Sequence, residues 1–204
     1  MKILAPIAAL FFLAAGMNHG RAQEPGPEQL IQRITDDVMT AIQSDKAIVG
    51  DKDKALKLAE QKVLPYVDFE EATRLAVSRA WLQASAEQKG KLVAEFRAML
   101  LRTYVNAVGT YAGTQPRLLP SRGAAYAAEA TVRCQLARSG GRPVLVAYEM
   151  RRTGAGWKIY DVSVEGMSLV LTYRTEFDGI LKQEGIDGLI RRLADKNAPA
   201  KLAL

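Results

Sequence analysis

The chain has 204 residues, a formal net charge of +6 and a hydrophobic content of 49%, which suffices for one domain with a sizeable core. Its only histidine, His19, lies in a segment that we expect to be removed. The mature chain would then exclude Ser-His-Asp and Cys-His catalysis and any imidazole metal site. A single cysteine, Cys134, excludes an intramolecular disulfide.

The N-terminus has the pattern of a secretory signal peptide, residues 1–22. Lys2 supplies a positive start, residues 3–15 form an apolar run, and Gly20 and Ala22 are the small residues that a signal peptidase reads. A membrane anchor is the alternative, but the run falls short of the roughly 20 apolar residues that span a bilayer. Cleavage would leave a single domain over residues 23–197, with a flexible tail over 198–204.

Signal-peptide removal lowers the formal charge from +6 to +4, because the segment holds Lys2 and Arg21 and no acidic residue. The remaining charges are dispersed along the chain. A mildly basic chain of this kind suits an anionic lipid surface, an acidic partner or an ordinary solvated surface. Isolated arginine pairs at 151–152 and 191–192, without interleaved aromatics, do not indicate nucleic-acid binding.

The first half of the chain reads as four helices. Apolar residues recur at helical spacing over 28–44, and a charged helix over 52–63 should end before Pro65. A predicted capping box at 68–71 starts a helix that runs towards residue 77 or 81. A second predicted box, at 85–88, starts a longer helix that ends at Gly109. The longer helix carries one apolar stripe: Leu92, Phe96, Met99, Leu100 and Tyr104.

The second half changes to strand periodicity. Residues 115–121 predict a weak edge strand, interrupted by prolines. Residues 129–138, 143–152 and 157–165 predict an antiparallel meander joined by turns at 139–142 and 153–156. Alternation places Cys134 on the buried face, where a small inert hydrophobe is expected rather than a reactive thiol.

Two helices, over 168–182 and 187–196, close the chain and are separated by Gly185. Ser168 is placed to cap the first of them, directly after the strand that stops at Gly166. Helices segregated from an antiparallel sheet indicate an α+β domain. A curved sheet with a long helix across it makes a cone that can hold a ligand, and the strand-to-helix hinge would form one wall.

Motifs for catalysis are weak. The chain has no phosphate-binding Gly-x-x-x-x-Gly-Lys loop, no dinucleotide fingerprint and no Ser-x-x-Lys pair. Asp161 and Glu165 share one strand face and could perform acid–base work on a small apolar substrate. The alternative interpretation gives them a structural role at the neighbouring helix N-terminus.

Several motifs, taken in order, resemble the MlaC/Ttg2D (toluene tolerance) family of periplasmic phospholipid-binding transport proteins. They are VLPYV at 63–67, AEFR at 94–97, YDV at 160–162, EGMS at 165–168, YR at 173–174 and GIDGL at 185–189. The resemblance extends from about residue 30 to 196 and includes Tyr104, Trp157 and Phe177. A branch of the family that accompanies hopanoid biosynthesis is similar as well.

The resemblance implies an NTF2-like cone with acyl chains in an apolar pocket. It further implies phospholipid shuttling between an outer-membrane lipoprotein–porin complex and an inner-membrane ABC transporter complex with an MCE-domain subunit, maintaining outer-membrane lipid asymmetry. No cofactor, catalytic residue or metal is expected. The alternatives are an NTF2-like enzyme using Asp161 and Glu165, a hopanoid carrier, and an assembly factor with a filled core.

The inward strand faces and the facing helices supply the residues that we expect around the acyl chains. They are Phe96, Leu100, Tyr104, Val146, Tyr148, Met150, Ile159, Val162, Val164, Met167, Leu169, Val170 and Tyr173. Lys158 and Arg174 are the candidates near the headgroup. Core and pocket lining share one sequence signature, so ordinary core packing is the alternative for each apolar residue.

Overall fold

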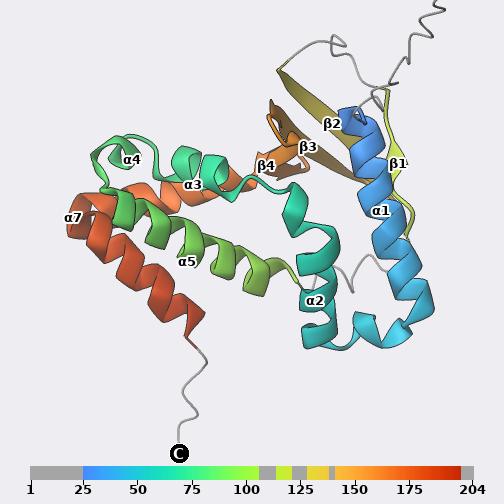
Figure 1. Ribbon diagram of the computed structural model, residues 1–204, viewed down its shortest axis with the longest axis horizontal. Helices are drawn as coiled ribbons and strands as arrows, with labels where there is room; N and C mark the ends of the chain where they lie inside the picture. The colour runs from blue at the N-terminus through green and yellow to red at the C-terminus, as the bar shows by residue number, and fades with distance from the viewer. Residues whose placement is uncertain (1–24, 106–113, 121–127, 138–140, 199–204) are drawn as a thin grey trace, which may run out of the picture.

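Two groups of elements stand side by side in the computed structural model, which describes residues 25–105, 114–120, 128–137 and 141–198. Helices α3, α4, α5 and α7 form a helical layer at the left of Figure 1, and the sheet lies at the right with α1 across it. The predicted signal peptide and the predicted helix end at Gly109 fall outside the described residues, as does the tail after residue 198.

The described helices agree closely with the sequence pattern. Their bounds are α1 Pro27–Ser44, α2 Lys52–Lys62, α3 Phe69–Val77, α4 Ala80–Gln83, α5 Ala86–Tyr104 and α7 Leu169–Asn197, with 3-10 turns at η1 Lys46–Val49 and η2 Leu64–Tyr66. The predicted extension of the third helix towards residue 81 is a separate short helix, α4, because the chain turns sharply at Ser78.

Side-chain caps fix the starts of the central helices. Ser85 and Gln88 form the predicted reciprocal capping box at α5. Only half of the other predicted box forms: Asp68 accepts a hydrogen bond from the Glu71 backbone N–H at 3.0 Å. The Glu71 carboxylate turns away to Arg74 and Arg151 instead of reaching back, because two guanidinium groups are stronger partners for it than one backbone N–H.

The sheet is an antiparallel meander in the order β1-β2-β3-β4-β5, so the predicted α+β class is confirmed. The strands are β1 Arg117–Leu118, β2 Glu129–Leu136, β3 Val144–Thr153, β4 Gly156–Val164 and β5 Met167–Ser168. The proline-interrupted edge strand shrinks to two residues. The pattern did not predict β5, which pairs with β4 after a tight turn at Glu165 and Gly166, where φ is 52° and 82°.

A bulge interrupts the pairing of β3 with β4. Glu149 lies opposite Asp161, whereas the next residue, Met150, lies opposite Ile159, so Tyr160 is the extra residue. The bulge shifts the alternation of β4 by one position. Ile159 therefore lies on the buried face together with Val162, which strict alternation from Ile159 would not allow.

Gly185 breaks the last helix as the sequence predicts. Its φ of 68° and ψ of −169° lie in a region that is essentially restricted to glycine. Three residues later, a Cβ on Gly188 would lie 2.2 Å from the Cβ of Glu184. The GIDGL motif therefore holds one glycine for the backbone turn and one for the close approach that follows it.

Each group of elements has its own apolar core. In the helical layer, Phe96, Phe177, Leu92 and Leu189 are almost completely buried among α3, α5 and α7. Beneath α1, the core of the sheet is formed by Leu30, Ile31, Val132, Met150 and Ile159.

A few contacts tie the two cores together. The Asp68 backbone N–H donates to the Ile159 carbonyl at 2.8 Å, and Val67 bridges to Ile159 in parallel. Arg151 of β3 pairs with Asp68 and Glu71 at the start of α3, at 2.7 and 3.0 Å.

Candidate lipid-chain cavity between helix α1 and the sheet

An apolar cavity of about 230 Å³ lies between α1 and the sheet. Helix α1 forms one wall and residues of β2, β3 and β4 form the other. Val63 and two residues that precede β1 complete the lining, which is Ile31, Ile34, Thr35, Val38, Met39, Ile42, Val63, Thr114, Pro116, Leu136, Tyr148 and Ile159. No charged side chain is among them, so the space suits a hydrocarbon chain.

The α1 wall follows directly from helix geometry. Positions 31, 34, 35, 38, 39 and 42 recur at three- and four-residue spacing, which places their side chains on one face of the helix. Pro27 at the start of α1 and a backbone hydrogen bond from Asp45 to Ala41 at its end fix the length of the helix. The opposite face carries Arg33, Asp36 and Thr40, which are exposed.

The sheet wall is held firmly at Ile159. Its carbonyl accepts from Asp68, and its side chain is buried beneath α1 with Met150 and Val132. Lys158, its neighbour, donates through Nζ to the Pro65 carbonyl at 2.5 Å. These contacts attach η2 and the start of α3 to β4, so this wall is much more constrained than α1.

Tyr148 gives the cavity a single polar edge on the sheet side. Desolvation raises the pKa of its phenol above the ordinary value, and the neighbouring Cys134 acts in the same direction. Burial likewise raises the pKa of the Cys134 thiol, as expected for the predicted small buried hydrophobe. Both groups are therefore neutral at physiological pH, and the cavity wall carries no charge there.

The structure brings one group of the sequence-predicted pocket residues to this region. Tyr148 and Ile159 line the cavity. Met150 and Val162 belong to the same cluster beneath α1. Val146 and Val164 lie further along the same sheet face, against Cys134 and Val144.

The other predicted pocket residues lie in or near the helical layer. Phe96, Val170 and Tyr173 are in its core and Leu100 packs against it. The ring of Phe96 meets those of Tyr173 and Phe177 edge-on, with centroids 5.2 and 5.3 Å apart. Leu169 is half-buried, whereas Tyr104 and Met167 are 38% and 68% exposed. None of these seven lines the cavity beneath α1.

The two predicted headgroup residues lie on different elements, β4 and α7. Lys158 sits at the junction of β4 and η2 through its bond to Pro65. Arg174 is exposed on α7 and lines a separate groove in the helical layer. Of the two, only Lys158 therefore lies on a strand, β4, that contributes to the sheet wall of the cavity.

Asp161 and Glu165 act as a scaffold for the strand-to-helix hinge. Asp161 accepts from Ser168 Oγ at 2.5 Å and from the Val170 backbone N–H at 3.0 Å. Ser168 in turn caps α7 by accepting from the Leu171 backbone N–H. Glu165 accepts from the Leu145 backbone N–H on β3. These bonds occupy the carboxylates that the enzymatic alternative would need.

Sequence reasoning did not assign the α1 side chains to the pocket. It identified the amphipathic stripe but gave no indication of which layer the stripe would cover. The width of the stripe was a signal that could have assigned them. Ile31, Thr35 and Met39 make the stripe wider than a helix needs in order to pack against one neighbouring element. Within the described residues, no cluster of metal-ligating side chains occurs. No helix in that same part of the chain combines the length and apolar character needed to cross a bilayer.

Comparison with known proteins gives matches that extend over most of the chain. A family profile described as "MlaC protein" matches residues 32–195. The intermembrane phospholipid transport system binding protein MlaC of Haemophilus influenzae is 24% identical over 174 residues, covering 83% of this chain and 81% of that protein. The toluene tolerance protein ttg2D of Pseudomonas putida is 23% identical, covering 87% and 84%.

Among solved structures, a phospholipid-binding protein from Ralstonia solanacearum, determined in complex with a phospholipid, superimposes with a TM-score of 0.79. It is 30% identical in sequence, and the match covers 85% of this chain and 97% of that one. The similarity therefore includes the sheet, α1 and the helical layer together rather than one of them alone.

Proposed function

This chain belongs to the MlaC protein family, and from that premise we propose that it is a phospholipid carrier whose acyl chains lie in the cavity between α1 and the sheet. The observation that carries the proposal is the uncharged cavity itself, lined by an apolar helix face and an apolar sheet face. The phospholipid complex of the Ralstonia relative supports it, because that match covers almost the whole relative.

The energetics of lipid transfer favour such a site. Each methylene that leaves water gains about 0.8 kcal/mol, so a two-chain lipid crossing an aqueous space would face a cost of roughly 20 kcal/mol or more. A carrier removes this cost by offering surroundings nearly as apolar as the bilayer. No catalytic group is required, and we propose that the protein is not an enzyme.

The cavity must enlarge to take a ligand of this size. At about 230 Å³ it lies below the range of roughly 300–1,000 Å³ typical of small-molecule pockets. We propose that α1 supplies the extra space by moving outward from the sheet. In the described residues, α1 has no backbone hydrogen bond to the sheet, and its polar side-chain contacts include the Lys62–Asp37 ion pair at 3.1 Å and the Arg33 guanidinium 6.0 Å from the centre of the Tyr66 ring.

The proposed acyl-chain contacts are therefore the α1 face together with Tyr148, Ile159, Met150 and Val162. Lys158 is the proposed residue near the headgroup, because it directly precedes the cavity-lining Ile159 on β4. We place the protein in the periplasm after cleavage of residues 1–22. There it would exchange lipid with an inner-membrane ABC transporter complex that includes an MCE-domain subunit and with an outer-membrane lipoprotein–porin complex. A hopanoid is the second candidate cargo, since the cavity lining would accept it equally.

The proposal is tested by the lipid that purifies with the protein. Native mass spectrometry of the protein from the periplasm should show an adduct with the mass of a two-chain phospholipid, whereas a hopanoid adduct would identify the second candidate. A protein that emerges with no lipid and does not take up phospholipid from vesicles would contradict the proposal.

A matched pair of variants locates the cargo. Thr35→Trp places an indole in the cavity, and Thr40→Trp places the same group on the exposed face of the same helix. We expect Thr35→Trp to lower the amount of bound phospholipid by about tenfold. An indole that fills the pocket removes apolar contacts with the lipid worth more than about 1.4 kcal/mol, which corresponds to a tenfold change in affinity. Thr40→Trp should retain the wild-type amount. Equal lipid content in both variants would place the acyl chains elsewhere.

A further inference from the structure

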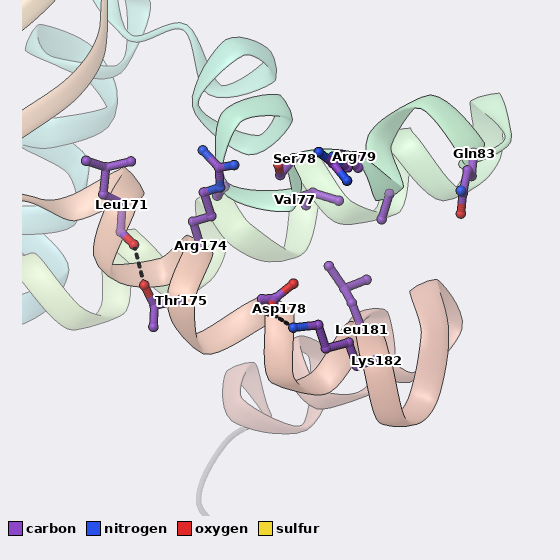
Figure 2. A pocket seen from close by; sticks show the side chains of 12 residues that line it. Val77, Ser78, Arg79, Gln83, Leu171, Arg174, Thr175, Asp178, Leu181 and Lys182 are labelled. Atoms are coloured by element: carbon purple, nitrogen blue, oxygen red, sulfur yellow. Dashed lines mark hydrogen bonds and ion pairs between the residues drawn. The ribbon is translucent and has the colours of Figure 1, made fainter.

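A second concave surface lies in the helical layer, outside the cavity beneath α1. It is a groove of about 770 Å³ between the α3–α4 turn and α7, and it shares no lining residue with that cavity. Figure 2 shows the two sides, with Val77, Ser78 and Arg79 facing Arg174, Asp178 and Leu181. Its size is within the range typical of ligand pockets.

The groove has an apolar floor. Ala76 and Val77 are buried at its base, and Leu181 is half-buried on the α7 side. At one end, Leu171 leaves 58% of its surface exposed. Leu171 and the half-buried Leu181 are therefore the apolar side chains of the groove that a partner segment would cover.

The rim of the groove carries unneutralised positive charge. Arg79 and Arg174 are exposed, and neither guanidinium has a hydrogen bond or ion pair with any described residue. Lys182, by contrast, is neutralised by Asp178 at 2.5 Å. Among the described lining residues, Arg79 and Arg174 are therefore the two free cations, and Figure 2 shows Arg174 rising from α7 towards the side that holds Arg79.

The backbone directly before Arg79 is strained. Ser78, directly before it, has φ of 58° and ψ of −127°, which a non-glycine residue adopts only at a cost of about 1–3 kcal/mol. The turn at Ser78 ends α3 and starts α4, so it forms the corner from which Arg79 projects. Strain of this kind is concentrated at functional surfaces.

We propose that this groove is a docking site for an acidic, amphipathic segment of a partner protein. Apolar side chains of the segment would cover the floor and Leu171, and its carboxylates would pair with Arg79 and Arg174. A trough between two helices suits a helix or an extended peptide better than a planar bilayer, which touches convex surfaces. Because the groove and the lipid cavity are separate, the proposal goes beyond the carrier function.

Site-specific photocrosslinking in cells that encode the protein tests the proposal on the full chain. Gln83 lines the groove and is exposed, and Gln61 is exposed on α2 outside it. Each is replaced in turn by p-benzoylphenylalanine. We expect Gln83→p-benzoylphenylalanine to yield a discrete protein adduct whose crosslinked peptide, sequenced by mass spectrometry, is acidic and amphipathic. Gln61→p-benzoylphenylalanine should not yield that adduct.

Charge reversal supplies the decisive control. Arg79→Glu combined with Arg174→Glu should lower the adduct yield by about tenfold, because like charges then face each other across the contact. Arg117→Glu with Arg142→Glu changes the net charge equally at exposed sites outside the groove and should leave the yield unchanged. Replacing the acidic residues of the captured segment with lysine should restore the adduct to the Arg79/Arg174 variant.

Four results would overturn the proposal: no protein adduct at Gln83, an adduct that survives charge reversal, a captured segment without acidic residues, or a lipid adduct in its place. Binding of the protein to phosphatidylglycerol-containing vesicles that depends on Arg79 and Arg174, without a protein adduct, would assign the groove to a membrane surface. Bound phospholipid is measured on the same variants. It should stay at the wild-type amount, so failure of docking and failure of the carrier function give separate readouts.

Discussion

The helical layer and the α1–sheet layer both contain large apolar side chains, yet among the described residues the cavity with an uncharged lining lies in the second. In the helical layer, the rings of Phe96, Tyr173 and Phe177 meet within 5.2–5.7 Å and fill the space between α5 and α7. Beneath α1, branched aliphatic side chains and one methionine face a sheet, and no aromatic ring crosses from the helix.

The contrast shows that large apolar side chains can either fix two helices against each other or leave space for a ligand. Interlocked rings fix the distance between helices, because aromatic pairs gain energy only in particular geometries. Aliphatic side chains on a helix that, among the described residues, has no backbone hydrogen bond to the sheet allow the two walls to separate and close again. The helical layer is therefore expected to carry stability, and the α1–sheet layer to carry the ligand.

Removal of a ring from the helical layer should have the largest effect. Phe96 is 1% exposed, so Phe96→Ala should lower the free energy of unfolding by about 3–5 kcal/mol, measured by denaturant unfolding. Phe96→Leu, which keeps most of the volume, should cost less than about 1.5 kcal/mol. The phospholipid bound per folded molecule should not change in either variant. A loss of lipid without a loss of stability would move Phe96 into the binding site.

The strand-to-helix hinge that joins the two layers should give the next largest effect. Asp161→Ala removes the acceptor for Ser168 Oγ and the Val170 backbone N–H, at a cost of about 2 kcal/mol. Asp161→Asn keeps one acceptor oxygen and should cost less. If Asp161 were instead a general acid or base, Asn and Ala would be equally damaging to function, and both proteins would remain as stable as the wild type.

A smaller and pH-dependent effect is expected where Glu71 ties α3 to β3. The hydrogen bond from Arg74 and the charge of Arg151 hold the Glu71 pKa below its ordinary value of 4.5. This carboxylate therefore stabilises the fold above pH 4.5, and the contribution is lost as the pH falls through the lowered pKa. Glu71→Gln should lower the free energy of unfolding by about 1 kcal/mol at neutral pH. It should also flatten the acid limb, which is the part of the curve of unfolding free energy against pH that falls at low pH.

The exposed neighbour Glu70 provides the control for that measurement. Glu70→Gln should leave both the stability and the acid limb as in the wild type. An acid limb that is unchanged by Glu71→Gln would mean that the ion pairs between α3 and β3 contribute nothing to the attachment of the two layers.

Local signals allowed much of this fold to be predicted from the sequence. The α1 stripe, the capping box at Ser85 and the Gly185 break depend on residues within a few positions of one another, and each forms as expected. The bulge at Tyr160 and the added strand β5 did not follow from periodicity. Both are set by the pairing of β4 with its neighbours, which no single segment encodes.

The candidate site was harder to predict for the same reason. Periodicity shows that Phe96 and Ile159 are both buried, but it does not show which surface each of them meets. Tertiary arrangement places Phe96 among the rings of α7 and Ile159 opposite α1. Pocket and core residues become distinguishable only when the facing element is known, and α1 was the element missing from the predicted set.

The chain's two tryptophans report directly on where the acyl chains lie, because one lies in each layer. Trp81 is buried in the helical core, and Trp157 packs against the cluster beneath α1. Single-tryptophan proteins, made by Trp81→Phe or Trp157→Phe, are loaded with phosphatidylcholine whose acyl chains carry bromine, a short-range quencher of indole fluorescence. Acyl-chain binding beneath α1 predicts strong quenching of Trp157 and little quenching of Trp81. Stronger quenching of Trp81 would place the acyl chains in the helical layer and contradict it.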